Sequence, residues 1–204
     1  MARNKSSSPR AASPAGRPGS IRIISGQWRG RKLPVHDAEG LRPTTDRVKE
    51  TVFNWLAADV RESRCLDLFA GSGSLGFEAL SRYASYVMMV EKEPKAARQL
   101  TLNLATLKSE QADVICRDAI QVLQQGCDTP FELVFLDPPF RKGLLEQVIP
   151  LLESQHWLTD NALIYLEREN EGTAPTLPSN WRLLKDKQAG QVCYQLYVRE
   201  QPVV

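Results

Sequence analysis

Short apolar segments alternate with amphipathic segments over most of this chain, and this alternation constrains the possible folds more than any other feature. The apolar segments lie at 65–69, 86–91, 112–117, 131–137 and 162–167, and helical patterns begin between them near Ser74, Pro94, Ala119 and Lys142. The apolar segments have the length of buried strands, and the segments between them repeat their apolar residues at helical spacing. Strands that alternate with helices form a mostly parallel sheet with helices on both faces. The sequence therefore predicts a doubly wound α/β fold.

The two ends of the chain depart from this alternation. Residues 181–187 and 191–199 predict an antiparallel hairpin, and residues 21–35 predict a second, smaller hairpin with glycine-containing turns. Residues 41–56 predict a helix capped by Thr44 or Thr45. Residues 1–20 are rich in Ser, Pro, Ala, Gly and Arg, a composition typical of disordered chain. We therefore expect a disordered basic tail at 1–20, a hairpin-and-helix extension at 21–59 and the α/β domain at 60–204.

Charge is distributed unevenly between the extension and the α/β domain. Residues 1–49 contain eleven Lys and Arg against three acids, a net charge of +8, whereas residues 50–204 have a net charge of −6. A basic arm on an acidic body favours a polyanionic partner such as a nucleic acid. A solvated basic tail without a partner is the alternative.

Cysteine and histidine usage excludes several classes of site. The four cysteines contain no C-x-x-C pair, which argues against a zinc site and against a disulfide framework, and the chain has only two histidines. We therefore expect no metal. No apolar run approaches the roughly twenty residues that span a bilayer, and the N-terminus lacks the apolar stretch of a secretory signal. We expect a bacterial cytoplasmic protein that is monomeric and has no membrane partner.

A glycine-rich loop follows the first strand of the alternating region. Gly71, Gly73 and Gly76 match G-x-G-x-x-G, and Glu91 ends the next strand twenty residues after Gly71. Glycines let the backbone approach a cofactor closely, and an acid at the second strand end binds a ribose. The loop, Ala70 included, thus predicts a nucleotide cofactor, and NAD, FAD and S-adenosylmethionine all remain open.

Two further carboxylates favour S-adenosylmethionine over the dinucleotides. Asp67 precedes the glycines, where it would repel a pyrophosphate and attract a cationic sulfonium with its ammonium group. Asp118 follows the third strand, where it can accept a hydrogen bond from an adenine amino group.

The fourth strand ends in Asp137-Pro138-Pro139-Phe140. Carboxyl ends of adjacent parallel strands face the same crevice, so Asp137 is expected beside the glycine loop. An exocyclic amine is a poor nucleophile, and two acceptors, an Asp137 oxygen and a proline carbonyl, would direct its lone pair toward a methyl donor. Phe140 offers a face on which a base can stack. Methylation of a pyrimidine carbon 5 would instead require a cysteine near this strand.

Four successive segments together resemble the RsmD family, the bacterial 16S ribosomal RNA guanine-N2 methyltransferases. They are 27–33 (QWRGRKL), 41–48 (LRPTTDRV), 67–73 (DLFAGSG) and 137–140 (DPPF), and the resemblance covers roughly 21 to 199. It implies a Rossmann-like, seven-stranded class I methyltransferase fold and S-adenosyl-L-methionine as cofactor. It also implies transfer of a methyl group to N2 of one guanine in 16S rRNA, within the assembled or assembling small ribosomal subunit.

The resemblance also implies roles for individual residues. By motif position, the cofactor residues would be Asp67, Ala70, Gly71, Gly73, Glu91 and Asp118, and the catalytic residues that hold the base would be Asp137, Pro138 and Phe140. The basic side chains expected to contact RNA are Arg22, Arg29, Arg31, Lys32, Arg42 and Arg47. For Arg42 and Arg47, contacts to the cofactor carboxylate and ion pairs with Asp46 and Glu50 are the alternatives, and a role in closing the substrate pocket is favoured. Trp28 either stacks on a base or packs the hairpin onto the domain.

Other functions remain open at this point. Related tetrapeptides serve methylation of adenine N6 in DNA and of glutamine amides in proteins, and residues 137–140 do not separate these substrates. A nucleotide-dependent oxidoreductase fits the glycine loop alone. A non-catalytic RNA-binding or assembly factor with the same fold is a further alternative.

Overall fold

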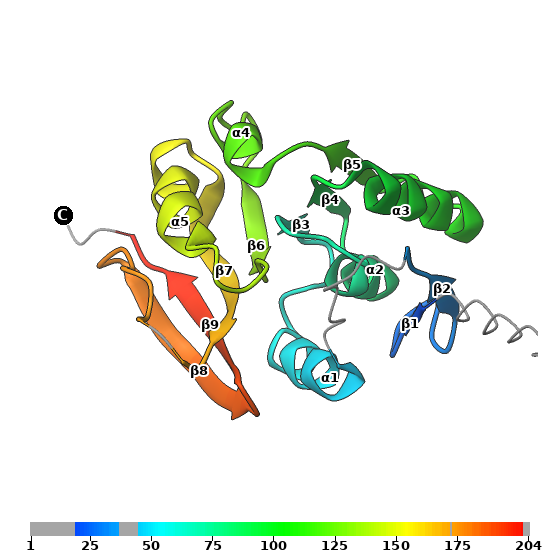
Figure 1. Cartoon of the computed structure of the whole chain (residues 1–204), viewed down its shortest axis with the longest axis horizontal. Coiled ribbons are helices and arrows are strands. Elements are labelled where there is room, and N and C mark those ends of the chain that lie inside the picture. Colours follow the sequence, from blue (N-terminus) through cyan, green and yellow to red (C-terminus); the bar gives the residue numbers. More distant parts are fainter. Residues whose placement is uncertain (1–18, 37–44, 172, 202–204) are drawn as a thin grey trace, which may run out of the picture.

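A seven-stranded sheet forms the centre of the molecule (Figure 1). The computed structural model describes residues 19–36, 45–171 and 173–201. In order across the sheet, the strands are β5 (Ala112–Cys116), β4 (Tyr86–Glu91), β3 (Arg64–Asp67), β6 (Phe131–Leu136), β7 (Leu158–Glu169), β9 (Val192–Arg199) and β8 (Trp181–Ala189). The strands from β5 to β7 are parallel, whereas β9 is antiparallel to both β7 and β8. This arrangement confirms the predicted doubly wound sheet and its C-terminal hairpin.

The helices lie on both faces of the sheet (Figure 1). One face packs against α1 (Asp46–Trp55), α2 (Ser74–Ser81) and α3 (Pro94–Leu107), and the other against α4 (Ala119–Leu123) and α5 (Leu144–Ser154). Successive strand residues alternate between the two cores, because side chains of a strand point to opposite faces. Cys65 belongs to the first core and Leu66 to the second. None of the helices in the described ranges is long and apolar enough to cross a membrane.

Local sequence signals explain where the helices begin. The hydroxyl of Thr45 accepts a hydrogen bond from Val48 N at 3.4 Å and caps α1, as predicted. Pro94 is the first residue of α3, where its missing N–H breaks no helical hydrogen bond. The predicted start near Lys142 was early, because Gly143 has a φ of 58° and α5 begins after it. The left-handed conformation of a glycine is incompatible with the helix interior.

The strand β7 begins before the predicted segment 162–167. Its first residue is Leu158, and its register against β6 shifts between Phe131 and Leu133. Asn161 has a φ of 62°, a conformation that asparagine tolerates better than most residues. This irregularity interrupts the apolar pattern, so sequence periodicity identified only the regular half of the strand.

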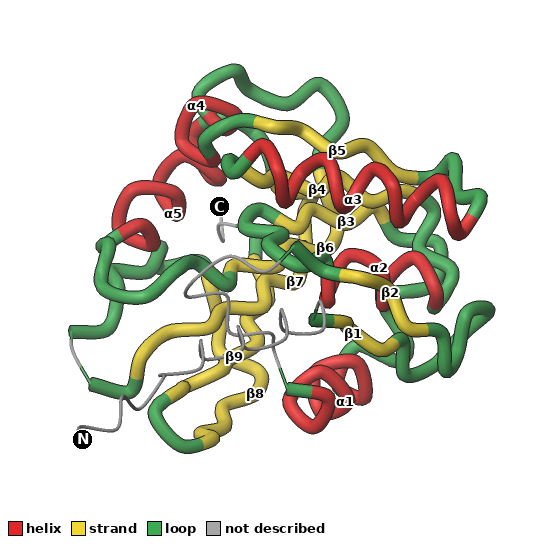
Figure 2. Tube along the Cα trace, turned by 45° about the vertical axis from the view of Figure 1, so that its right-hand side comes forward, coloured by secondary structure: helices red, strands yellow, loops and turns green. Residues whose placement is uncertain are grey.

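The predicted N-terminal hairpin consists of β1 (Ser20–Arg22) and β2 (Lys32–Pro34), which lie beside α2 and α1 (Figure 2). Strand β1 begins one residue inside the segment expected to be a disordered tail, and residues 1–18 lie outside the described ranges. Trp28 is 9% exposed and belongs to the core formed with α1, α2 and α3. Of the two roles considered for Trp28, the structure therefore shows packing of the hairpin onto the domain.

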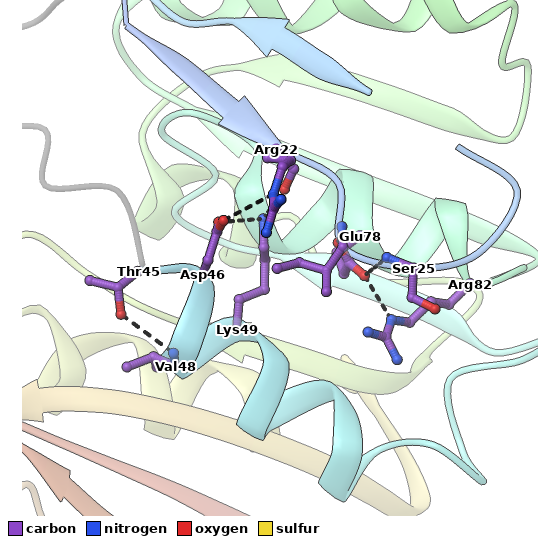
Figure 3. A network of polar contacts seen from close by, with 9 residues as sticks. Arg22, Ser25, Thr45, Asp46, Val48, Lys49, Glu78 and Arg82 are labelled. Carbon is purple, nitrogen blue, oxygen red and sulfur yellow. Dashed lines mark hydrogen bonds and ion pairs between the residues drawn. The ribbon is translucent and has the colours of Figure 1, made fainter. Parts of the chain in front are cut away.

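A buried glutamate on α2 holds the hairpin loop (Figure 3). Glu78 is 0% exposed and accepts hydrogen bonds from Ile24 N at 2.8 Å, Ser25 N at 3.0 Å and Arg82 Nε at 2.8 Å. Buried charges are tolerated when they are paired and hydrogen-bonded, as this carboxylate is. Nearby, Gly26 approaches so closely that a Cβ atom would lie 1.8 Å from the carbonyl oxygen of Ser81.

Lys49 on α1 makes a second attachment to the hairpin. Its side chain is buried, and Nζ donates a hydrogen bond to the carbonyl oxygen of Arg22 at 2.6 Å (Figure 3). Burial lowers the pKa of Lys49, and the carboxylates of Glu78 and Asp46 oppose that shift. The extension thus shares one core with the sheet, and a polar network joins its hairpin to α1 and α2.

We expect Glu78→Ala to lower the free energy of unfolding by roughly 3–5 kcal/mol, because it leaves two backbone N–H groups and the Arg82 guanidinium without their acceptor. Urea denaturation followed by circular dichroism measures the change. Glu110→Ala, at an exposed carboxylate beyond α3, is the control and should change stability by no more than about 0.5 kcal/mol. Equal denaturation midpoints for the Glu78 variant and the native chain would show that the network contributes nothing.

Candidate active site

The carboxyl ends of the parallel strands open into a cleft of about 530 Å³. Residues after β3, β4, β5 and β6 line it, as expected for the crevice of a doubly wound sheet. The predicted site residues that it brings together are Asp67, Ala70, Gly71, Glu91, Asp118, Asp137, Pro138 and Phe140. These residues come from four loops that are far apart in the sequence.

The predicted cofactor residue Gly73 lies behind the lining of the cleft. Its φ is 78°, and a Cβ atom there would lie 2.5 Å from a ring carbon of Phe77 and 2.6 Å from a methyl carbon of Leu100. Its N–H donates to Ala70 O at 2.6 Å, which closes the turn. Gly73 therefore shapes the loop and allows α2 to begin directly after it.

Glu91 ties the glycine loop to the end of β4. One carboxylate oxygen accepts from Gly71 N at 2.9 Å, and the other accepts from Glu93 N at 2.7 Å. A carboxylate has about four acceptor positions, so these bonds leave capacity for further donors in the cleft. Glu91 thus orders the loop and also lines the cavity.

Asp67 is buried beneath the start of α2. It is 2% exposed, and its Oδ2 atom accepts from Gly76 N at 3.0 Å. A Cβ atom at Gly76 would lie 3.1 Å from that oxygen and 2.9 Å from Met89, so glycine permits this approach. Burial raises the pKa of Asp67 to about 7, the bond from Gly76 opposes the rise, and the charge of Glu91 adds to it.

A buried hydroxyl lies in the first turn of α2. Ser74 is 5% exposed and lines the cleft, and its Oγ atom has no hydrogen-bond partner within the described part of the chain. Because buried polar atoms are normally hydrogen-bonded, we expect a ligand or a water molecule to contact this hydroxyl. The N-terminus of a helix also favours negative charge. Ser74 was not among the predicted site residues, although its place directly after the second glycine of the motif is a usable signal.

Asp118 and the loop after β6 complete the cleft. Asp118 caps α4, because its Oδ1 atom accepts from Ile120 N at 2.9 Å, and the cap holds its carboxylate at the cleft wall. Asp137 and Phe140 are half-buried, and Pro138 is buried between them. A smaller cavity of about 170 Å³ lies beside the same loop, and residues 138–140 line both cavities.

The predicted RNA-contacting side chains lie outside the cleft. Those on the described ranges are Arg22, Arg29, Arg31, Lys32 and Arg47, and all are exposed. Arg22 makes an ion pair with Asp46 at 3.2 Å, in a position that remains open to solvent. Arg42 lies outside the described residues. The structure therefore places these exposed basic side chains on the hairpin and α1, outside the cleft that Asp67, Glu91, Asp118 and Asp137 line.

The sequence of this chain matches a known family over most of its length. Residues 21–198 match the model of a family described as conserved hypothetical protein 95. The chain is 58% identical over 182 residues to "Ribosomal RNA small subunit methyltransferase D" of Escherichia coli (strain K12), and the match covers 89% of this chain and 91% of that protein.

Solved structures show the same fold. The structure titled "Putative methyltransferase yhhF from Escherichia coli" superimposes with a TM-score of 0.84 at 55% identity, covering 89% of this chain and 99% of that one. The structure titled "A putative sam-dependent methyltransferase from Streptococcus mutans" superimposes with a TM-score of 0.70 at 11% identity, covering 93% of this chain and 57% of that one. The second likeness concerns the fold alone.

The raised pKa of Asp67 makes stability depend on pH. The ordinary pKa is 3.8 and the folded value is about 7, so between these values the folded chain binds a proton that the unfolded chain has lost. The contribution of Asp67 to stability therefore becomes less favourable as pH rises from about 4 to about 7. At about 1.4 kcal/mol per pKa unit, the change is at most roughly 4 kcal/mol.

We expect Asp67→Asn to remove the pH dependence of stability that Asp67 causes. The amide oxygen of asparagine can still accept a hydrogen bond from Gly76, and the amide does not ionise. Urea denaturation of the ligand-free protein at pH 4.5 and pH 7.5 measures it. The variant should gain stability relative to the native chain as pH rises. A stability difference that is the same at both pH values would contradict the raised pKa.

Proposed function

The chain belongs to the family described as conserved hypothetical protein 95, the RsmD family, and on that premise we propose that it methylates the exocyclic N2 atom of a guanine in 16S ribosomal RNA. The chain is an S-adenosylmethionine-dependent ribosomal RNA methyltransferase with a Rossmann-like class I fold. The identity of the methylated atom, the assembled or assembling small subunit as substrate, and action as a monomer in the cytoplasm are the proposed refinements.

One observation carries the proposal: a single cleft joins the glycine loop to the loop formed by residues 137–140. The first loop has the features of a nucleotide site, and the second presents a carboxylate, proline carbonyls and an aromatic ring. A cofactor on the first loop and an amine at the second are therefore neighbours. Positioning of this kind accelerates a transfer between two bound partners.

The residues of the cleft fit S-adenosylmethionine. Glu91, at the end of β4, is placed for the ribose hydroxyls, and Asp118 for the adenine amino group. The buried hydroxyl of Ser74 and the first turn of α2 suit the carboxylate of the cofactor. The carboxylate of Asp67 attracts the positive groups of the cofactor. When bound, S-adenosylmethionine supplies an electrophilic methyl group on its sulfonium.

The loop after β6 prepares the amine. Asp137 accepts one amino N–H and the carbonyl of Pro138 accepts the other, so that the nitrogen lone pair faces the methyl donor. Asp137 is also placed to receive the proton that the nitrogen loses on methylation. Phe140 stacks on the base, which contributes about 1–3 kcal/mol. A guanine in an exposed loop reaches this site at a lower unstacking cost than a paired one.

The basic extension binds the RNA in this proposal. Its exposed side chains Arg22, Arg29, Arg31, Lys32 and Arg47 contact phosphates, and we propose the same role for Arg42. The proposed organisation keeps 1–20 as a basic tail, 21–59 as the RNA-contacting extension and 60–204 as the methyltransferase domain.

We expect Asp137→Ala to lower methyl transfer at least about 100-fold while cofactor affinity changes little, because the carboxylate acts on the amine. The assay uses radiolabelled S-adenosylmethionine, small ribosomal subunits from a strain that lacks this enzyme, and free 16S RNA in parallel. Nucleoside mass spectrometry identifies the product, and calorimetry measures cofactor binding.

Asp59→Ala, at an exposed carboxylate after α1, is the control and should retain full activity. Unchanged turnover in the Asp137 variant would reject the mechanism. A methylated adenine as the only product would reject the assignment of guanine N2.

We expect the combined variant Arg29→Ala, Arg31→Ala and Lys32→Ala to bind the substrate RNA more weakly and with a shallower salt dependence. Each phosphate contact contributes about 0.7–0.9 to the slope of log affinity against log salt concentration, so the slope should fall by about 2–3. Filter binding between about 50 and 200 mM salt measures it. An unchanged slope would remove these side chains from the RNA interface.

A further inference from the structure

A second carboxylate, Glu167, lies at the same edge of the sheet as Asp137. Strands β6 and β7 are parallel and pair Leu136 with Leu166. Glu167 is the next residue of β7, and Asp137 is the first residue after the end of β6. Because neighbouring strands are about 4.8 Å apart, this register points to a position of Asp137 beside Glu167.

The two carboxylates also share one face of the sheet. Phe135 and Tyr165, two positions earlier, are paired across β6 and β7, and their rings make an edge contact at a centroid distance of 6.2 Å. Both belong to the core beneath α1 and α2. Side chains two positions apart on a strand point to the same face. The row therefore continues toward Asp137, which lines the cofactor cleft, and Glu167, which lines the smaller cavity beside it.

A buried tyrosine orients Glu167. Glu167 is 5% exposed, and its Oε1 atom accepts a hydrogen bond from the Tyr165 hydroxyl at 2.5 Å. Burial raises the pKa of Tyr165 well above its ordinary value, and the charges of Glu167 and Asp137 add to the rise. The hydroxyl thus remains a donor at neutral pH and lies within electrostatic range of both carboxylates.

Glu167 also borders open space beside the catalytic loop. It lines the cavity of about 170 Å³ that shares residues 138–140 with the cofactor cleft. A carboxylate has about four acceptor positions, so the hydrogen bond from Tyr165 does not by itself fill the carboxylate of Glu167. Phe140 lines both cavities, so a planar base on its ring would lie between Asp137 of the larger cavity and Glu167 of the smaller one.

Two adjacent hydrogen-bond acceptors favour binding of guanine over adenine. Guanine carries donors at two neighbouring ring positions, the N1–H and the amino group on C2. Adenine carries a 6-amino group beside an N1 lone pair, which a carboxylate repels. We propose that Glu167 is a specificity-determining residue that accepts the N1–H of the target guanine while Asp137 accepts its amino N–H. This inference rests on the proposed function and deepens it.

The analogue 2,6-diaminopurine tests the inference, because it keeps the 2-amino group and replaces the N1–H by a lone pair. The target guanine is replaced by this base through ligation of a synthetic RNA segment, and the RNA is reconstituted into small subunits. We expect the native enzyme to prefer guanine over the analogue about 100-fold in kcat/KM, since a site that binds a donor rejects a base without it.

Glu167→Gln should reverse this preference. The glutamine amide has nearly the same shape and can donate an N–H to the lone pair of the analogue, so activity on 2,6-diaminopurine should rise while activity on guanine falls. Tyr165→Phe, which removes the orienting hydroxyl, should reduce the preference for guanine several-fold. Glu171→Gln removes the same charge from an exposed residue of the small cavity and should leave the ratio of the two activities unchanged.

The outcomes separate this inference from the proposed function. N2-methylguanosine from unmodified subunits supports the proposed function. Equal activity of the native enzyme on guanine and the analogue would then overturn the role of Glu167, and this comparison needs no variant. A proportional loss on both bases in Glu167→Gln would overturn it as well, because a purely structural residue behaves in that way. Absence of N2-methylguanosine would overturn the proposed function and the inference together.

Discussion

Parallel pairing of β5, β4, β3 and β6 is the constraint on which the rest of the structure depends. It brings four strand ends to one edge, so residues from four distant parts of the sequence line one cleft. The chain leaves β3 toward β4 on one side and reaches β6 on the other, and such a reversal opens a crevice between the loops. The site is thus a consequence of strand order, to which each loop adds its chemistry.

The acids of the cleft differ in what they contact, although all lie at this edge. Asp67 is held beneath α2 by the backbone of Gly76, and burial keeps its pKa near neutrality. Glu91 and Asp118 each anchor backbone N–H groups at the cleft wall. Asp137 follows the end of β6, beside the strand that carries Glu167. In the proposed function, Asp67, Glu91 and Asp118 serve the cationic cofactor and Asp137 serves the amine.

The N-terminal extension is part of the same folded body. Glu78 and Lys49 attach the hairpin through backbone atoms, and Trp28 joins the core beneath it. Because these contacts use backbone and apolar groups, the basic side chains Arg29 and Arg31 remain exposed. A rigid attachment of this kind presents charge to a large partner at a fixed position relative to the cleft.

The sequence by itself determined the strand and helix order, the glycine loop and the acids at the strand ends, because periodicity and turn chemistry are local properties. It also determined the starts of α2, α3 and α4. Only the tertiary structure decided that Gly73 packs against Phe77, that Ser74 is a buried hydroxyl in the cleft and that Glu78 is an internal anchor. The proposed position of Asp137 beside Glu167 depends on the register that pairs Leu136 with Leu166. Such relations join residues that are distant in sequence, and no local pattern encodes them.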